Sequence, residues 1–187
     1  MFVRAARSED LDRICSIYEV AKTYMRAHGN DVQWVGGDYP GRELLAGDIE
    51  KEQLFVVADD SVSGPCDGAE YAEDAGTASE RIYGVFAFII GADPTYSYIE
   101  SGEWNADGPY ATIHRMGSSQ EVKGVGACAF GWASEQCLAK GLNLRCDTHE
   151  LNITMQSLLK KQGFRHCGTI YVEEDDYPRL AYEKARW

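Results

Sequence analysis

The sequence lacks a long apolar run, closely spaced cysteine pairs and an excess of basic residues. Its longest apolar run, Val85 to Ile90, is far too short to cross a bilayer. The N-terminal segment MFVRAARSEDL has none of the apolar character of a secretory signal. We therefore expect a soluble protein that resides in the cytoplasm and has no membrane partner.

The cysteine pattern indicates neither a metal site nor a disulfide framework. The six cysteines are residues 15, 66, 128, 137, 146 and 167, and no two of them have the C-x-x-C spacing of a zinc or redox motif. Four of them fall among apolar neighbours in expected helices or strands. We predict buried free thiols and no bound metal.

Acidic residues outnumber basic ones, with 30 Asp and Glu against 18 Lys and Arg and a formal net charge of −12. Nucleic-acid binding needs a basic face, so we expect no nucleic-acid partner. An acidic surface instead favours, weakly, a cationic substrate such as an amine. Much of the excess lies in residues 59–80, which hold seven acidic residues and no Lys or Arg. We interpret this segment as a flexible acidic insertion at about 59–80.

Length and composition predict one domain over residues 1–187. A chain of 187 residues can bury a full core, and 44% hydrophobic with 26% charged residues is ordinary globular composition. Phe2 to Ala6, Leu54 to Ala58 and Ile82 to Ile90 have the character of strands, the last two as a hairpin. Ser8 to about Ala27 has the spacing of an amphipathic helix.

The most informative stretch runs from Tyr110 to Phe164. A strand with alternating apolar residues, Tyr110 to Met116, leads through a glycine turn into a long helix that ends at Gly141, where glycine can take the left-handed conformation. A second strand, Leu142 to Thr148, leads to Asn152, which is a good N-cap for a shorter helix. The order is strand, turn, helix, strand, helix.

The glycine turn, Lys123-Gly124-Val125-Gly126, has the chemistry of an anion site. Glycines let the backbone approach a ligand closely, and the helix behind the turn offers unpaired N–H groups and a positive dipole end. The turn is not a P-loop, because no Gly-Lys-Ser/Thr follows, and Ala129 replaces the third glycine of a Rossmann fingerprint. Taken alone, a Gly-x-Gly turn is weak evidence for an anion site, because such turns more often have a purely structural role.

This order of elements resembles the core of the GNAT superfamily, the acyl-CoA-dependent N-acyltransferases. Their Gln/Arg-x-x-Gly-x-Gly/Ala loop corresponds to Glu121 through Gly126, with the leading Gln or Arg absent. Their later motif, Asn followed by Gly-Phe, corresponds to Asn152, Gly163 and Phe164. The resemblance extends over most of the chain, to a bacterial branch marked by Gly29-Asn30 with Gln33-Trp34, Gly102-Glu103-Trp104, Ile113-His114-Arg115 and Arg145-Cys146-Asp147-Thr148-His149.

The resemblance implies an α/β (α+β) fold with a mixed, mostly antiparallel central sheet of about six or seven strands, about four flanking helices and two splayed central parallel strands. It implies acetyl-CoA as the acyl donor, a small-molecule or peptide amine as acceptor, and often a homodimer. The cofactor-binding residues that it implies are Met116, Gly117 and Ser118 for the pantetheine arm, Val122, Lys123, Gly124, Val125, Gly126 and Ala127 for the pyrophosphate, and Asn152 for the pantetheine.

An amine must lose a proton before it attacks a thioester, so a base is needed. The candidates are His114, Asp147, His149 and Glu103. His114 shares a strand face with Tyr110, Thr112 and Met116, whereas Arg115 is expected on the other face. A histidine in a central strand is either a hydrogen-bonded core residue or a catalytic base. Glu103 is either a base or a solvated carboxylate in a turn.

Two further groups of residues are candidates for acceptor binding. Arg145, Asp147 and His149 share one face of a strand. Either Arg145 and Asp147 satisfy each other, or Asp147 orients His149 or the acceptor amine while Arg145 binds the substrate. The loop from His28 to Trp34 contributes Asn30, Gln33 and Trp34. These either wall the acceptor pocket or bond to loop backbone and plug the edge of the core.

Three functional hypotheses follow. The first is an acetyl-CoA-dependent N-acetyltransferase. The second is a catalytically silent acyl-CoA-binding module, because Leu159 occupies the position where many GNAT enzymes have a tyrosine general acid and neither Tyr110 nor Tyr171 is selected as a substitute. The third is a thiol enzyme that uses Cys146 or Cys167 with His114 or His149. We favour the first.

Overall fold

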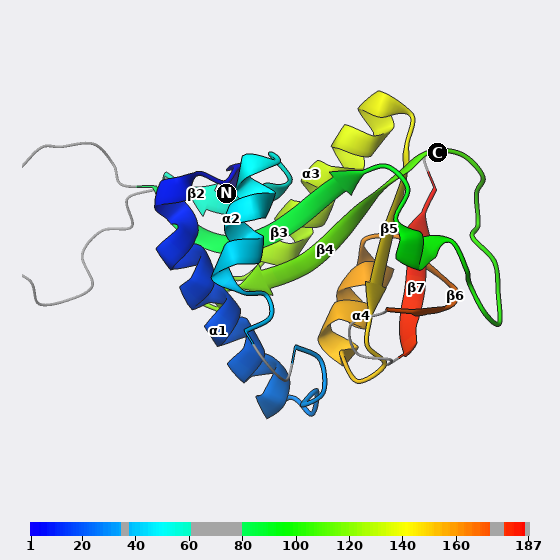
Figure 1. The fold of residues 1–187 in the computed structure, drawn as a ribbon, viewed down its shortest axis with the longest axis horizontal. Helices are drawn as coiled ribbons and strands as arrows, with labels where there is room; N and C mark the ends of the chain where they lie inside the picture. Colours follow the sequence, from blue (N-terminus) through cyan, green and yellow to red (C-terminus); the bar gives the residue numbers. More distant parts are fainter. Residues whose placement is uncertain (35–37, 61–79, 173–177, 186–187) are drawn as a thin grey trace, which may run out of the picture.

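Seven segments of the chain pair into one sheet in the computed structural model, which describes residues 1–34, 38–60, 80–172 and 178–185 (Figure 1). The strands are β1 (Phe2–Ala5), β2 (Leu54–Asp59), β3 (Arg81–Ile90), β4 (Tyr110–Ser118), β5 (Asn143–Thr148), β6 (Arg165–Tyr171) and β7 (Pro178–Lys184). The α-helices in these ranges are α1 (Leu11–Ala27), α2 (Arg42–Glu50), α3 (Val125–Lys140) and α4 (Ile153–Lys161).

The strand order is β1-β2-β3-β4-β5-β7-β6, and β4 and β5 form a parallel pair while the other neighbours are antiparallel. The predicted fold class, a mixed and mostly antiparallel sheet flanked by helices, is confirmed. The predicted hairpin is also confirmed, since β2 pairs with β3 from Leu54 opposite Ala87 to Asp59 opposite Arg81.

The parallel pair is short. Its register joins Tyr110 to Asn143, Ala111 to Leu144 and Thr112 to Arg145, whereas β4 continues to Ser118 and β5 to Thr148. The two strands therefore separate after Thr112 and Arg145, as Figure 1 shows toward the lower ends of both. Beyond that point, the edge of β4 that faces β5 has no strand partner among the described residues.

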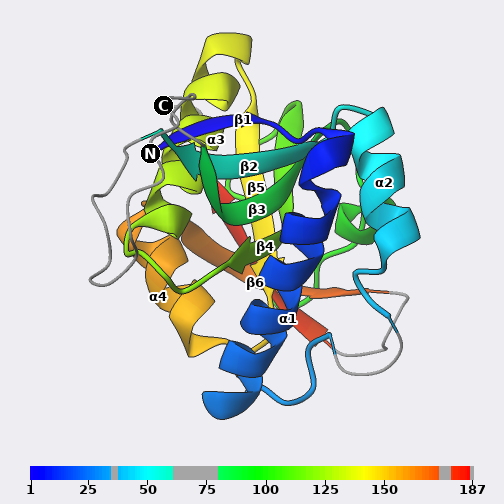
Figure 2. The same ribbon diagram turned by 90° about the vertical axis from the view of Figure 1, so that its left-hand side faces the viewer.

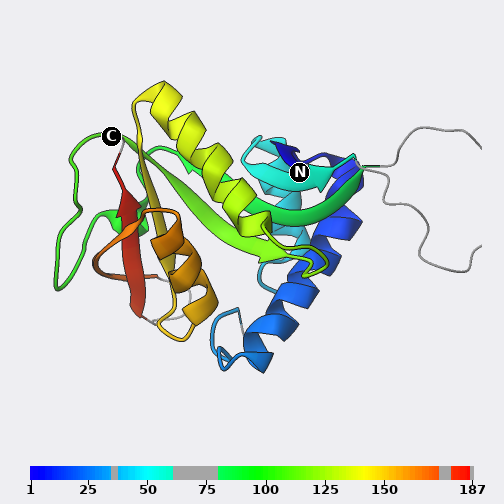
Figure 3. The ribbon, with the colours of Figure 1, turned by 180° about the vertical axis from the view of Figure 1, so that it is seen from behind.

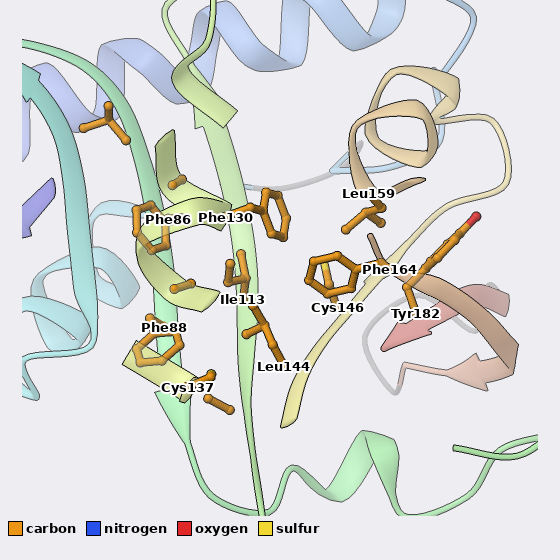
Figure 4. Packing of buried hydrophobic residues seen from close by; sticks show 14 of the residues in the cluster. Phe86, Phe88, Ile113, Phe130, Cys137, Leu144, Cys146, Leu159, Phe164 and Tyr182 are labelled. Carbon is orange, nitrogen blue, oxygen red and sulfur yellow. The ribbon is translucent and has the colours of Figure 1, made fainter. Parts of the chain in front are cut away.

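Helices cover both faces of the sheet (Figures 2 and 3). On one face, Ile14 and Ile17 of α1 and Leu45 of α2 are fully buried against β2 and β3. On the other, Phe130 of α3 and Leu159 of α4 belong to the larger apolar cluster, which also contains residues of β3, β4 and β5 (Figure 4). Burial of these apolar side chains, at about 25 cal/mol per Å², holds the helices to the sheet.

Local sequence signals account for the ends of the two helices that follow β4 and β5. Gly141 takes the left-handed conformation at the C-terminus of α3, with φ 66°. The Asn152 side chain accepts a hydrogen bond from the backbone N–H of Met155 and caps α4. Both predicted boundaries are confirmed.

The predicted acidic insertion falls mostly in residues 61–79, which lie outside the described residues. The described flank of the insertion is anchored, because the Arg4 guanidinium donates to the Glu80 carboxylate and also forms an ion pair with Asp10.

Candidate functional site

A cavity of about 370 Å³ opens where β4 and β5 separate. Its wall comes from the end of α1 and the loop after it, the end of β3, both parallel strands, α4 and the start of β7. The cavity brings together six residues that the sequence predicts for the site: Gln33, Trp34, His114, Met116, Asp147 and Asn152.

His114 lies between two carboxylates on this wall. Its Nε2 atom is 2.9 Å from Oδ2 of Asp93, and its Nδ1 atom is 3.9 Å from Oδ1 of Asp147. The hydrogen bond from His114 lowers the pKa of Asp93, against the opposing effect of burial. An ionised Asp93 can only accept, so Nε2 of His114 donates to it and Nδ1 is the ring nitrogen that faces Asp147.

Asp147 is fixed by a buried tyrosine. The Tyr96 hydroxyl donates to Oδ1 of Asp147 at 2.6 Å, and the Tyr96 ring lies 5.9 Å from the ring of His114. Burial, with the charge of Asp147 as a further cause, raises the pKa of Tyr96 well above its usual value, so this hydroxyl stays protonated and donates. The hydrogen bond therefore fixes the position of the Asp147 carboxyl group beside His114.

A β-bulge shapes this part of β4. Val85 of β3 pairs with Gly117 and Ala87 with His114, so β4 has one extra residue between these pairs. Arg115, at the bulge, has φ 52°, and His114, Arg115 and Met116 all line the cavity. Strict alternation, which placed Arg115 on the opposite face from His114 and Met116, is wrong here because the bulge changes the direction of successive side chains.

The predicted acceptor loop is tied to the cap of α4. The Asn30 side-chain amide donates to Oε1 of Gln33 at 2.9 Å, and the Asn152 amide donates to the same oxygen at 3.1 Å. Asn30 itself is buried, whereas Gln33 and Trp34 line the cavity, with Trp34 edge-on to Tyr18. The loop and α4 thus share one hydrogen-bonded network.

The predicted pyrophosphate turn has the geometry of an anion site. Gly124 has φ 88° and precedes the first turn of α3, whose N–H groups at Val125, Gly126 and Ala127 have no intrahelical acceptor. A Cβ placed on Gly124 would meet only the end of the Met1 side chain, at 3.5 Å. At Gly126 the absence of a side chain is explained by packing instead, because a Cβ there would lie 2.5 Å from the Leu158 side chain of α4.

Besides Asn30, three of the predicted catalytic and acceptor-binding residues do not line the cavity: Arg145, His149 and Glu103. The Arg145 guanidinium lies 3.9 Å from the ring centroids of both Trp104 and Tyr110 and donates to Glu183 at 2.8 Å. His149 is buried and accepts a hydrogen bond from a backbone N–H, and Glu103 is exposed. Arg145 thus pairs with Glu183 rather than with Asp147.

The cavity also contains residues that sequence reasoning missed. Asp93 follows β3 and precedes Pro94, which marks only a break in the chain. Its partner His114 is 21 positions away, so no local pattern connects the two. Arg115 and Arg179 also line the cavity. Of these three residues, only Asp93 has a recognisable local role in the sequence, as the residue before Pro94 at the start of a short helical turn. Its side chain caps that turn by accepting a hydrogen bond from the backbone N–H of Thr95.

The remaining tyrosine and cysteine candidates have little support as reactive groups, although Cys146 lines the cavity. Leu159 is fully buried, Tyr110 and Tyr171 lie outside the cavity wall, and the Tyr171 hydroxyl bonds to Glu100. Burial raises the pKa of Cys146 well above its usual value and that of Cys167 to about 11. A nucleophilic cysteine needs a thiolate, which burial of this kind disfavours.

The residues present fit a CoA thioester. The turn at Gly124 offers N–H groups to a pyrophosphate, and the unpaired edge of β4 beyond Thr112 offers backbone groups to an extended arm, much as an open sheet edge binds a peptide strand. Asn152 differs from the implied role, because its side chain already caps α4 and bonds to Gln33. Within the described residues no cluster of three or more His, Cys, Asp or Glu could hold a metal.

Similarity to solved structures agrees with this geometry. The chain is similar to a GNAT-family acetyltransferase from Streptococcus agalactiae, with 29% identity, a TM-score of 0.70, and coverage of 99% of this chain and 95% of that one. A GNAT-family acetyltransferase from Listeria monocytogenes is 16% identical, with a TM-score of 0.63 and coverage of 98% and 93%. A ribosomal-protein-alanine N-acetyltransferase from Brucella melitensis is 15% identical, with a TM-score of 0.55 and coverage of 99% and 99%.

The fold is that of the acyltransferases with a splayed parallel pair at the centre of a mixed sheet. More specifically, the protein has the GNAT acyl-CoA N-acyltransferase fold, and its neighbours support acyl transfer as the class of reaction. Neither a protein-family model nor a curated protein matches the sequence significantly. Among the described residues, no helix combines the length and apolar composition needed to cross a bilayer.

Proposed function

We propose that this protein is an acetyl-CoA-dependent N-acetyltransferase that acylates a primary amine of a small molecule or peptide. The observation that carries the proposal is His114, held at Nε2 by Asp93 and presented at Nδ1 to a cavity between the splayed strands. When bound, acetyl-CoA supplies the thioester carbonyl that the amine attacks. We retain as predictions a cytoplasmic location, a homodimer and a single domain over residues 1–187.

In this proposal His114 acts as the base. The acceptor ammonium is attracted to Asp93 and Asp147, and Nδ1 of His114 accepts its proton, directly or through a water molecule. Tyr96 keeps Asp147 oriented through the 2.6 Å hydrogen bond. Met116 to Ser118 hold the pantetheine arm along the free edge of β4, and Val122 to Ala127 with Lys123 hold the pyrophosphate.

The first experiment is calorimetric titration of acetyl-CoA and desulfo-CoA into the wild type and two matched variants, Gly124→Asp and Gly124→Asn. Both side chains tolerate the left-handed backbone at this position and have nearly the same shape, but only aspartate repels a pyrophosphate. We expect micromolar binding that Gly124→Asp abolishes and Gly124→Asn largely keeps. Absence of binding by the wild type would overturn the proposal.

A silent acyl-CoA-binding module is the second candidate, favoured by the burial of Leu159 where a general acid is usual and by Glu121, which occupies the usual Gln or Arg position and pairs with Arg13. The two candidates differ in turnover. A thiol-release assay with a panel of amines separates them, because only the enzyme converts acetyl-CoA to free CoA at a rate that depends on the amine.

A further inference from the structure

Each of the two carboxylates beside His114 belongs to a residue that a tyrosine holds in place. The Tyr96 hydroxyl donates to Oδ1 of Asp147 at 2.6 Å. The Tyr110 hydroxyl accepts from the backbone N–H of Asp93 at 2.8 Å. An aromatic side chain is rigid, so the orientation of each ring determines where its hydroxyl oxygen lies. The positions of Asp93 and Asp147 around His114 therefore depend on what fixes the two rings.

The two tyrosine rings pack with Trp104 as one aromatic group. The Tyr96 and Tyr110 rings are stacked, with centroids 6.2 Å apart and planes at 24°. The Trp104 ring lies 5.3 Å from that of Tyr96, and its Nε1 donates to the Tyr96 backbone carbonyl at 3.2 Å. This aromatic group packs in a small apolar cluster with Ile170 and Ala181, apart from the two larger clusters.

Arg145 contacts two members of the aromatic group and ties them to β7. Its Cζ atom is 3.9 Å from the ring centroids of both Trp104 and Tyr110. Its Nε donates at 2.8 Å to Oε1 of Glu183, its cross-strand neighbour on β7. Oε2 of Glu183 accepts from the backbone N–H of Ala106 at 2.9 Å. Both ends of the ion pair thus hold the segment between β3 and β4, which also contains one of the two carboxylates.

The choice of an arginine at this position has a geometric explanation. A buried ion pair adds little to stability, because apolar residues of similar volume often replace it without loss. A planar guanidinium, however, lies against ring faces while its N–H groups still bond to a carboxylate. Arg145 and Glu183 are both buried, so this contact is shielded from water. The pair therefore specifies the orientation of the rings.

We infer that Arg145 is a positioning residue for the proposed reaction. This inference rests on the proposed acetyltransferase function and adds a residue that lies outside the cavity wall. The guanidinium fixes the Tyr110 ring directly and the Tyr96 ring through Trp104, and the two tyrosine hydroxyls then hold the two carboxylates that flank His114. This role differs from the substrate contact that the sequence predicted for Arg145.

The first test replaces the ion pair without leaving a buried charge. Arg145→Met is combined with Glu183→Gln, whose amide oxygen can still accept from the backbone N–H of Ala106. We expect kcat for thiol release to fall by about tenfold or more, because small misplacements far from the chemistry are costly. KM for acetyl-CoA should stay within about twofold of the wild-type value, since Arg145 does not touch the donor.

The control is Ile14→Val, a buried substitution in the separate apolar cluster under α1. It weakens packing without touching the aromatic group, so kcat should remain at the wild-type value. A wild-type kcat in the folded Arg145→Met, Glu183→Gln protein would overturn the inference. So would an equal fall in kcat for Ile14→Val, because the effect would then be a general response to weakened packing.

A second variant, Tyr110→Phe, tests the route from Arg145 to the carboxylates. It keeps a ring against the guanidinium but removes the oxygen that accepts from Asp93. If both changes act on the same carboxylate, their effects on kcat are not independent. We expect the combined variant to lose kcat by a factor at least about threefold smaller than the product of the separate losses. Losses that multiply fully would overturn the route.

Nuclear magnetic resonance gives a readout that needs no turnover. The chain has four histidines, so the carbon-bound ring protons of His114 are assigned by their absence in His114→Gln. These signals should shift in Tyr110→Phe and in the Arg145→Met, Glu183→Gln protein, and stay in place in Ile14→Val.

The two readouts separate this inference from the proposed function. Amine-dependent turnover with an unchanged kcat and unchanged His114 signals in the variants would overturn the inference and leave the acetyltransferase proposal intact. No turnover of any amine by the wild type would overturn the proposed function. The His114 signals would then still decide whether Arg145 positions this part of the site.

Discussion

At the scale of single residues, the arrangement of His114 predicts a specific kinetic defect. His114→Gln removes the atom proposed to accept the proton while keeping a polar side chain of similar size, so we expect kcat to fall by about 10²–10³-fold. The matched control is His166→Gln, on an exposed position of β6. Thiol release with a saturating amine measures both, and a wild-type kcat in His114→Gln would remove His114 as the base.

Asp93 predicts a dependence of stability on pH. The hydrogen bond from His114 lowers its pKa in the folded state, whereas the unfolded value is about 3.9. The stabilisation is therefore fully present above about pH 4 and is lost as the pH falls through the folded pKa. The difference in free energy of unfolding between wild type and Asp93→Asn, from urea titrations, should be largest near neutral pH and shrink toward pH 3. A constant difference would contradict this reading.

At the scale of elements, Asn152 connects the stability of α4 to the acceptor loop. Asn152→Ala removes both the helix cap and the bond to Gln33, and we expect a loss of about 1 kcal/mol from the cap alone. Asn152→Ser can still cap the helix but cannot reach Gln33 as an amide does. Urea denaturation should show a smaller loss for the serine variant, and both should raise KM for the acceptor. Equal losses for the two variants would assign the effect to the bond with Gln33.

Elements whose signals are local could be predicted, and features that depend on a distant partner could not. Gly141 and Asn152 end and begin helices through their own backbone and side-chain chemistry, so the order of elements after β4 was predictable. The bulge at Arg115 depends on the register of β3, and Arg145 depends on Glu183 of β7. Alternation along one strand contains neither partner, which is why it misplaced Arg115.

At the scale of the whole molecule, the sheet should tolerate loss of the acidic segment. The last pair of β2 and β3 joins Asp59 to Arg81, so the two ends of the segment lie side by side. We expect replacement of residues 61–79 by a short Gly/Ser linker to change the melting temperature by only a few degrees, because loop length affects stability weakly. Thermal denaturation and thiol release measure the outcome. Loss of folding would show that the segment contributes to the core.

The short seam between β4 and β5 also has a mechanical consequence. Three residue pairs join two half-sheets, one ending in β1 and the other in β6. We expect a pulling force applied between Phe2 and Arg165, at the two outer strands, to separate β4 from β5 first. That pairing has the fewest residue pairs in the path between the two attachment points. The proposed acyl-CoA ligand would contact both strands across the separation. We therefore expect the force at which the two half-sheets separate to rise with the concentration of acetyl-CoA.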